Sequence, residues 1–323
     1  MITDKPLVSI NNLSIRYNTS VGIVSAVEGI NFSIRKKEIF ALVGESGCGK
    51  STVAYALMRL ISEPGEITGG SIIFQDQDLL SLSHKEMINI RGKKISMIFQ
   101  NPLDSLNPVI RIGSQVSEAI VLDKISKKEA WEKAVEIIKE VKIPDPDERV
   151  NSYPFELSGG MRQRVMIGMM ISRKPKLLIA DEPTTALDVT IQAQILEIIK
   201  DLKEEIGTSI FLITHDFGIV AEIADRIAVM YAGKIVEIGD VFQIFERPCH
   251  PYTQLLMGSL PRMNKKEGRL KTIFGTVPNL IKPPKGCRFH ERCPNSKKEC
   301  QEIEPKMVEI EKGHLCACVL MRK

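Results

Sequence analysis

The chain has 323 residues, of which 43% are hydrophobic and 26% are charged, and these proportions are ordinary for a globular protein. The length predicts about two domains, or one domain with an appendage. The net charge of +4 is small for this length and the lysines are dispersed, so the composition does not favour a nucleic-acid-binding protein. No apolar stretch approaches the roughly 18 residues of a membrane span, and the chain does not begin with a signal-peptide pattern, so we expect a cytosolic location.

The first part of the chain has the pattern of β-strands. Apolar and polar residues alternate over residues 8–10, 13–15 and 26–34, which predicts an antiparallel sheet of half-buried strands. Residues 38–43 form a nearly continuous apolar run that ends at a glycine, as is typical of a strand buried on both faces. A glycine-rich loop follows, and we predict a helix from residue 50 to about 61.

Later strands alternate with helices, which predicts a parallel sheet and an α/β fold. The strand candidates are residues 95–99, 177–180, 210–214 and 227–230, and a helix is predicted over residues 191–206. Between residues 99 and 175 the apolar spacing becomes helical, so a helical insertion interrupts the sheet. We predict a main domain over residues 1–250, with a helical subdomain at about 100–175, and a small Cys-rich C-terminal domain over 251–323.

Residues 44–51, GESGCGKS, match the phosphate-binding pattern G-x-x-x-x-G-K-[ST] between a predicted strand and a predicted helix. Glycines allow backbone N–H groups to converge on phosphate oxygens, and the helix presents its positive end to the same anion. Lys50 is predicted to reach the outer phosphates, Ser51 to bind Mg²⁺, and Thr52 to lie near the α-phosphate. A chance glycine turn is the alternative. The predicted ATP contacts in this segment are Gly44, Glu45, Ser46, Gly47, Cys48, Gly49, Lys50, Ser51 and Thr52.

Two carboxylates follow the apolar run at residues 177–180. Adjacent acids are costly unless a cation lies nearby, so we predict that Asp181 binds Mg²⁺ through water and that Glu182 holds the water that attacks the γ-phosphate. A solvated acidic strand end is the alternative, and a phosphate-binding loop in the same predicted sheet argues against it.

Two further side chains are predicted at strand ends, where ligands of open α/β sheets bind. His215 follows the strand that ends at residue 214, and we predict that it contacts the γ-phosphate. Gln100 follows the strand at 95–99, where a neutral amide can touch Mg²⁺ or the attacking water. The alternatives are a structural histidine and a turn glutamine.

Residues 157–164, LSGGMRQR, resemble the signature sequence of ABC ATPases. The physical properties agree, because Ser158 is a good N-cap and Gly159 and Gly160 permit close backbone approach at a helix start that favours an anion. In the ABC family this loop completes the ATP site of the opposite subunit, so the resemblance implies two ATP molecules between two subunits. Met161 departs from the glutamine that most signatures carry at this position.

The resemblance extends from residue 7 to about 245 and implies a P-loop ABC ATPase core, with a mixed, mainly parallel sheet and an antiparallel β-subdomain. It implies that Tyr17 stacks on adenine and that residues 185–188 form the D-loop. It assigns the catalytic roles to Lys50, Gln100, Glu182 and His215, and the Mg²⁺ ligands to Ser51, Gln100 and Asp181.

Within the ABC family the chain is similar to the ATP-binding subunits of bacterial dipeptide and oligopeptide importers, a group that also serves nickel and some sugars. The similarity rests on residues 100–103 with 106–108, on Met161, on residues 250–253 and on the Cys-rich tail. It implies a heterodimer with a related ATPase, two membrane permeases, an external binding protein and a peripheral location at the cytoplasmic face of the membrane. A permease coupling helix would bind in a groove by Gln100.

Seven cysteines are unevenly placed, and all but Cys48 and Cys249 lie near the C-terminus. Disulfides are rare in a reducing cytosol, so clustered thiols indicate metal or iron–sulfur ligands, or small structural residues. No C-x2-C pair is present, which weakens the case for zinc. Some related importer subunits are held to bind a 4Fe-4S cluster in a similar tail, and this implies the ligands Cys287, Cys293, Cys300 and Cys318, with Cys316 spare. Zinc and a metal-free thiol-rich segment remain alternatives.

These patterns together predict an ATP-binding and ATP-hydrolysing subunit of an ABC importer, with dipeptides or oligopeptides as cargo. An importer ATPase for nickel or sugars, a non-transport ABC ATPase and a redox-sensing interaction protein are the alternatives. The resemblance alone favours peptide over nickel and sugars, because an ATPase subunit of this kind does not itself bind the cargo.

Overall fold

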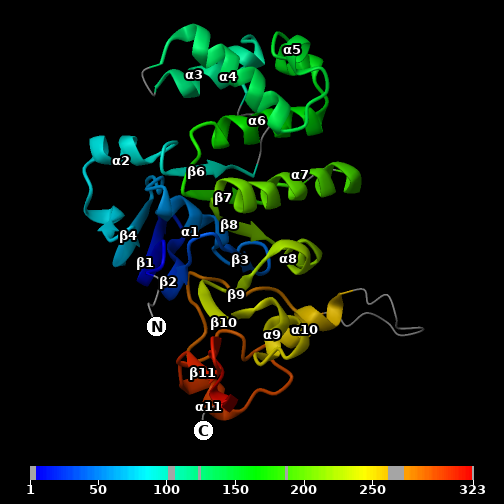
Figure 1. The fold of residues 1–323 in the computed structure, drawn as a ribbon. Helices are drawn as coiled ribbons and strands as arrows, with labels where there is room; N and C mark the ends of the chain where they lie inside the picture. Colours follow the sequence, from blue (N-terminus) through cyan, green and yellow to red (C-terminus); the bar gives the residue numbers. More distant parts are fainter. Residues whose placement is uncertain (1–4, 101–105, 123–124, 186–187, 261–272, 322–323) are drawn as a thin grey trace, which may run out of the picture. The chain divides into compact units, whose positions relative to one another are not determined.

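The structure is a computed structural model that describes residues 5–100, 106–122, 125–185, 188–260 and 273–321. The chain forms two compact units (Figure 1). The first unit consists of Met1–Ser81 and Ile213–Lys323, and the second consists of Leu82–Leu212. None of the helices in the described ranges is long and apolar enough to cross a membrane.

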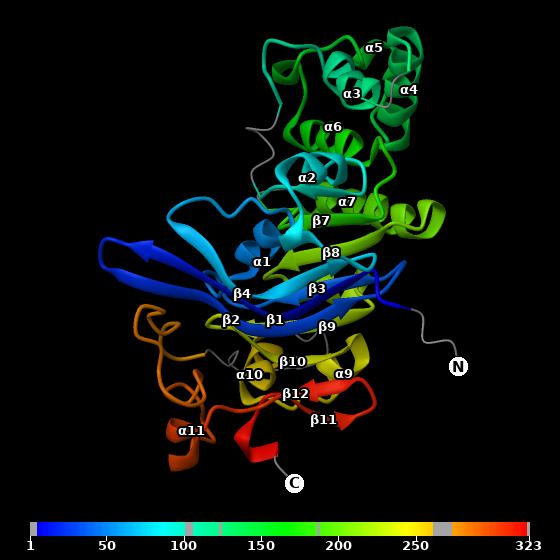
Figure 2. The same ribbon diagram turned by 90° about the vertical axis from the view of Figure 1, so that its left-hand side faces the viewer.

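The first unit contains an antiparallel sheet with the strand order β2-β1-β4-β5. Figure 2 labels the strands β2, β1 and β4 of this sheet. Its central strand β1 pairs Val8 with Ile34 of β2 and with Phe74 of β4. Ile10, Leu13 and Ile15 on β1 are at most 1% exposed, as expected of a strand that covers the core with one face. The antiparallel sheet predicted from the alternating pattern is therefore present. The strands are β1 Val8–Thr19, β2 Gly22–Ile34, β4 Gly65–Phe74 and β5 Gln77–Asp78.

A second group of strands in this unit has the order β11-β12-β10-β9-β3. The β3 and β9 strands are parallel, with Phe40 opposite Arg226, and every residue of β3 is buried, which explains its continuous apolar sequence. The tail of the chain adds β12 and β11, because Glu237 of β10 lies opposite Cys316. The strands are β3 Ile39–Val43, β9 Arg226–Tyr231, β10 Lys234–Asp240, β11 Val308–Glu311 and β12 His314–Cys316.

Helix α1 begins at Lys50 and ends at Leu57, earlier than the predicted residue 61. The reason lies at Arg59, which has a left-handed φ of 48°. The N–H groups of Arg59 and Leu60 donate to the carbonyl oxygens of Ala56 and Tyr55, which is the hydrogen bonding of a Schellman motif and stops the helix. The other helices of the first unit are α8 Phe217–Ile223, α9 Val241–Glu246, α10 Pro251–Ser259 and α11 Lys298–Glu302.

The second unit combines two parallel strands with helices. Ile95 of β6 lies opposite Leu177 of β7, and both strands are fully buried. Strand β8, Ser209–Thr214, then leads the chain from this unit back into the first. The bounds are β6 Ile95–Ile98, β7 Leu177–Asp181, α2 His84–Ile90, α3 Ile112–Val121, α4 Lys127–Glu140, α5 Pro146–Arg149, α6 Gly159–Ile171 and α7 Val189–Asp201.

The helices α3, α4 and α6 carry the core of the predicted helical region. Ser126 caps α4 reciprocally with Glu129, and the apolar face of α4 is buried. Gly168 on α6 lets this helix approach α4 closely, since a Cβ there would lie 2.8 Å from Cγ2 of Ile137. The helical spacing in the sequence therefore reflects helix-on-helix packing. The limits of the domains at residues 100–175 and 251–323 stay predictions.

Candidate active site

The phosphate loop, residues 44–51, connects the buried strand β3 to helix α1, as the sequence predicted. Its backbone packs tightly against neighbouring strands. A Cβ at Gly44 would lie 2.1 Å from the carbonyl oxygen of Met230, and a Cβ at Gly49 would lie 2.4 Å from that of Ala26. Gly49 also has a φ of 106°, which side chains other than glycine rarely adopt. Packing and conformation thus both require glycine in this loop.

Lys50 places its charge inside the phosphate loop. The side chain is 5% exposed, and its Nζ donates hydrogen bonds to the carbonyl oxygens of Gly44, at 2.8 Å, and Glu45, at 3.0 Å. The Sγ of Cys48 lies 3.9 Å from the same ammonium. Burial nonetheless raises the pKa of the Cys48 thiol, so this residue adds no negative charge to the loop.

In the second unit, strand β7 ends at Asp181, whose side chain is buried, with 0% exposure. The next residue, Glu182, has a left-handed φ of 47°, an uncommon conformation that is concentrated at functional sites. Its carboxylate accepts hydrogen bonds from Nε2 of Gln100 at 3.1 Å and from Oγ1 of Thr185 at 2.9 Å. The structure therefore brings Gln100 and Glu182 together, and it adds Thr185, for which the sequence predicted no contact with Glu182.

The signature sequence forms the start of helix α6. Ser158 is its N-cap, as predicted, and accepts a hydrogen bond from the Met161 N–H at 3.3 Å. A Cβ at Gly160 would lie 2.7 Å from Cγ2 of Ile191 on α7. Gln163, 1% exposed, donates to the carbonyl oxygen of Pro183 at 2.7 Å and so ties the signature helix to the segment after Glu182. Sequence reasoning missed this role of Gln163, although its place inside the signature was a signal.

The remaining predicted residues are distributed as follows. His215 is exposed after β8, and Tyr17 lies on β1 with its ring over Gly65, where a Cβ would lie 2.6 Å from the tyrosine Cε1. Two sets of predicted residues lie outside the described residues. They are residues 101–103, which carry part of the similarity to peptide importers, and residues 186–187 of the predicted D-loop. The first unit carries Tyr17, Ser46, Gly47, Ser51, Thr52 and His215, whereas the second carries Gln100, Gly159, Asp181 and Glu182.

The cysteines of the tail are buried or half-buried thiols. Burial raises the pKa of Cys287 to about 11, and it also raises the pKa values of Cys293 and Cys318. In the described part of the chain, the ligand atoms that lie close enough together to hold one metal ion belong to Glu237, Cys249 and His314, within 4.8 Å of one another. None of these three residues was predicted as a ligand.

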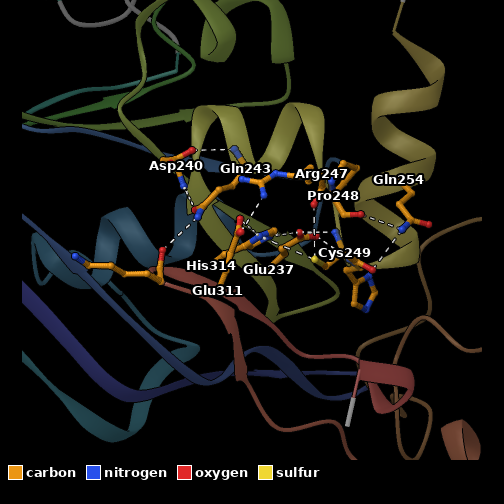
Figure 3. A network of polar contacts seen from close by, with 11 residues as sticks. Glu237, Asp240, Gln243, Arg247, Pro248, Cys249, Gln254, Glu311 and His314 are labelled. Atoms are coloured by element: carbon orange, nitrogen blue, oxygen red, sulfur yellow. Dashed lines mark hydrogen bonds and ion pairs between the residues drawn. The ribbon is translucent and has the colours of Figure 1, made fainter. Parts of the chain in front are cut away.

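Figure 3 shows the polar network around Glu237, which is 0% exposed. Its Oε1 accepts hydrogen bonds from the Cys249 N–H at 2.7 Å and from Nε2 of His314 at 2.7 Å, and its Oε2 accepts one from the His250 N–H at 2.9 Å. Three donors thus satisfy the buried carboxylate without a metal ion. The network joins β12 and the start of α10 to β10, and we interpret it as a structural joint.

Comparisons with known proteins agree with the geometry. The family model of the ABC transporter matches residues 27–185, and that of the oligopeptide/dipeptide transporter C-terminal region matches residues 236–300. The oligopeptide transport ATP-binding protein OppD of Bacillus subtilis is 51% identical, over 97% of this chain and 88% of that protein. The dipeptide transport ATP-binding protein DppD of the same organism is 48% identical, over 97% and 94%.

Among solved structures, a dimer of the ATP-binding cassette MJ0796 in a post-hydrolysis state with ADP and Pi has a TM-score of 0.65. It is 27% identical and covers 72% of this chain and 98% of its own. The fold and the phosphate loop therefore define the class as an ABC ATPase. The chain belongs to the family of ABC transporter ATP-binding proteins that includes the oligopeptide and dipeptide transport proteins OppD and DppD. The predictions of the ABC fold, of ATP hydrolysis and of the family are confirmed.

The iron–sulfur prediction is corrected. The matched families and relatives are described by ATP binding and by peptide transport, and none of these descriptions includes a cluster. Within the described residues, the compact group of ligand atoms is the Glu237 network and contains none of the four predicted ligands. The physical reason for the error is that the spacing of cysteines along the chain does not determine which ligand atoms the fold brings together. The predicted ligands were Cys287, Cys293, Cys300 and Cys318.

Proposed function

We propose that this chain binds MgATP at residues 44–51 and hydrolyses it to power the import of dipeptides or oligopeptides. The observation that carries the proposal is the buried ammonium of Lys50 inside a glycine loop that is packed against β2 and β9. A preformed loop of this kind presents backbone N–H groups and a cation to phosphate oxygens. The names of the relatives OppD and DppD favour peptides as cargo.

The residues that we propose to act in hydrolysis come from both units. In the first unit, Lys50 donates to the phosphates, His215 contacts the γ-phosphate and Tyr17 stacks on adenine. In the second unit, the Glu182 carboxylate orients the attacking water, with Gln100 beside it at 3.1 Å. Hydroxyl and carboxylate oxygens suit Mg²⁺, and burial of the Asp181 carboxylate fits a nearby divalent cation, so Ser51, Gln100 and Asp181 would hold this ion. The ion supplies charge neutralisation for the transferred phosphate.

The proposed assembly is a head-to-tail pair of ATPase subunits, in which Ser158, Gly159 and Gly160 face the ATP of the partner. The dimeric state of the similar cassette MJ0796 supports a pair, and we propose a distinct paralogue as the partner. Two membrane permeases bind the pair at the cytoplasmic face of the membrane, where this chain is a peripheral subunit, and an external binding protein delivers the cargo.

Reconstitution tests this proposal. The chain is coexpressed with a related ATPase and two permeases, placed in liposomes with the binding protein, and supplied with MgATP and a labelled dipeptide or oligopeptide. We expect ATP-dependent peptide uptake that is lost in the Lys50→Ala variant. Uptake of nickel or a sugar without peptide uptake would contradict the cargo, and ATP turnover that persists in Lys50→Ala would contradict the nucleotide site.

A further inference from the structure

An arginine of the C-terminal tail contacts the phosphate loop. The Nη1 of Arg292 lies 3.1 Å from both carboxylate oxygens of Glu45, which is the second residue of the loop. The side chain of Arg292 is 8% exposed and that of Glu45 is 27% exposed, so the pair is largely removed from water. Both residues belong to the first unit. An ion pair of this burial is screened much less than one on the surface.

Arg292 is itself held in place by three further contacts. Its Nη1 donates to Oη of Tyr231 at 3.2 Å, and its guanidinium lies 5.6 Å from the centroid of the Tyr231 ring. Its Nε donates to the carbonyl oxygen of Phe274 at 3.0 Å. Since a guanidinium has donors in a rigid plane, these contacts fix the direction in which it meets Glu45.

A second residue from the C-terminal part of the chain binds the backbone at the same position. Tyr252 of α10 is 0% exposed, and its Oη accepts a hydrogen bond from the Glu45 N–H at 3.1 Å. The Tyr252 ring packs against Tyr231 and Phe289, with ring centroids 4.7 Å and 5.3 Å away. The backbone and the side chain of Glu45 are therefore both anchored by residues that follow residue 230.

Glu45 connects this anchor to Lys50, because its carbonyl oxygen accepts a hydrogen bond from Nζ of Lys50 at 3.0 Å. Its carboxylate is also a negative charge in a loop that must accept the phosphates of ATP. Without a cation, this charge would repel the nucleotide, and the repulsion grows as the local dielectric falls. The anchor thus provides both a fixed loop geometry and neutralisation of the one carboxylate among residues 44–51.

We propose that Arg292 and Tyr252 form a clamp on Glu45 through which the C-terminal tail sets the ATP affinity of the phosphate loop. Arg292 neutralises the Glu45 carboxylate, and Tyr252 holds the Glu45 backbone. Both are positioning residues, since they act on the nucleotide through Glu45. This inference rests on the proposed binding of ATP at residues 44–51.

The test is a set of titrations of the full-length chain with the fluorescent analogue mant-ATP in the presence of Mg²⁺. We expect Arg292→Met to weaken binding about tenfold, because it leaves Glu45 unpaired beside the phosphates. Arg292→Lys keeps the charge and should lose only a few-fold. Tyr252→Phe removes the acceptor for the Glu45 N–H and should weaken binding about fivefold.

The double variant Glu45→Gln/Arg292→Met separates neutralisation from general support of the fold. We expect it to recover most of the affinity, because the repelling carboxylate is gone. If Arg292 only stabilised the tail, the double variant would bind as weakly as Arg292→Met, since the Tyr231 and Phe274 contacts are lost in both. That result, or wild-type affinity in Arg292→Met, overturns the clamp.

Two controls complete the experiment. Arg247 also pairs with a glutamate, Glu311 at 2.9 Å, but its side chain is 65% exposed, and Arg247→Met should leave mant-ATP affinity unchanged. Lys50→Ala reports on the nucleotide site itself. If Lys50→Ala abolishes binding while Arg292→Met binds normally, the clamp alone fails. If Lys50→Ala binds normally, the proposed nucleotide site fails as well.

Discussion

In the phosphate loop, Gly44 and Gly49 bring the backbone against the carbonyl oxygens of Met230 and Ala26, whereas Glu182 in the second unit is oriented by side chains, those of Gln100 and Thr185. The phosphate loop presents backbone groups to the nucleotide. The Glu182 carboxylate is instead a reactive side chain that accepts hydrogen bonds from Gln100 and Thr185. This difference suggests that the first region controls binding of the nucleotide and that the second controls the chemical step. Substitutions in the two regions should therefore have separable effects.

The largest expected effect is on turnover. Glu182→Gln should lower the ATPase rate of the assembled complex by roughly 10²–10⁴-fold, because the attacking water loses its acceptor, while mant-ATP binding persists. Glu204→Gln changes an exposed glutamate in the same unit and serves as the control. A fully active Glu182→Gln complex would contradict the proposed role of Glu182 in orienting the attacking water.

Lys50→Ala should mainly weaken the binding of ATP. Loss of a buried cation that bonds two loop carbonyls should weaken mant-ATP binding by about 10- to 100-fold in the titration. Arg247→Met again serves as the control, because it removes a charge from an exposed side chain whose ion-pair partner is Glu311. Should Lys50→Ala keep its affinity and lose only its rate, the separation between the two regions would be wrong.

Gly49→Ala tests whether the loop is shaped by its backbone. The new Cβ meets the Ala26 carbonyl oxygen, and a φ of 106° disfavours alanine, so we expect the free energy of unfolding in urea to fall by about 2 kcal/mol. The matched control is Gly47→Ala, where φ is 78° and an added Cβ would meet no atom of the described residues within 4 Å beyond its chain neighbours, so only the smaller conformational cost applies. Equal effects at the two positions would contradict the packing argument.

The smallest effect concerns the joint that holds β12 to β10. The hydrogen bond with Glu237 raises the pKa of His314 above its usual 6.5 in the folded chain. The resulting stabilisation is complete below pH 6.5 and is lost as the pH rises through the raised pKa. The unfolding free energy in urea should therefore fall from pH 6 to pH 9 by less in His314→Gln than in the unsubstituted chain. The exposed His84 supplies the control substitution, His84→Gln, whose profile should match that of the unsubstituted chain.

The sequence predicted the phosphate loop well because its requirements are local. The geometry of the loop requires only a strand followed by glycines and a lysine at fixed spacing. In the structure Lys50 lies at the start of α1, and its Nζ bonds the carbonyl oxygen of Gly44 in the loop. The N-cap Ser158 was predictable for the same reason. By contrast, the early end of α1 depends on a left-handed Arg59, and arginine carries no sequence signal for that conformation.

Contacts between distant residues were the part that sequence reasoning could not reach. Nothing in the spacing of residues 45 and 292 shows that an arginine of the tail meets the phosphate loop. The contact of Thr185 with Glu182 depends on how the chain turns after β7. The tail thiols were misread because their spacing is visible in the sequence, whereas the fold decides which ligand atoms lie together, and in the described residues these belong to Glu237, Cys249 and His314.

Strand β11 is the edge strand of the sheet to which the tail contributes β11 and β12. An edge strand exposes unpaired backbone groups that can pair with a strand of another chain. This strand is only four residues long, and its sequence VEIE carries Glu309 and Glu311. The short length and the negative charge of β11 both disfavour edge-to-edge pairing between chains. The tail therefore ends in an edge strand that opposes aggregation.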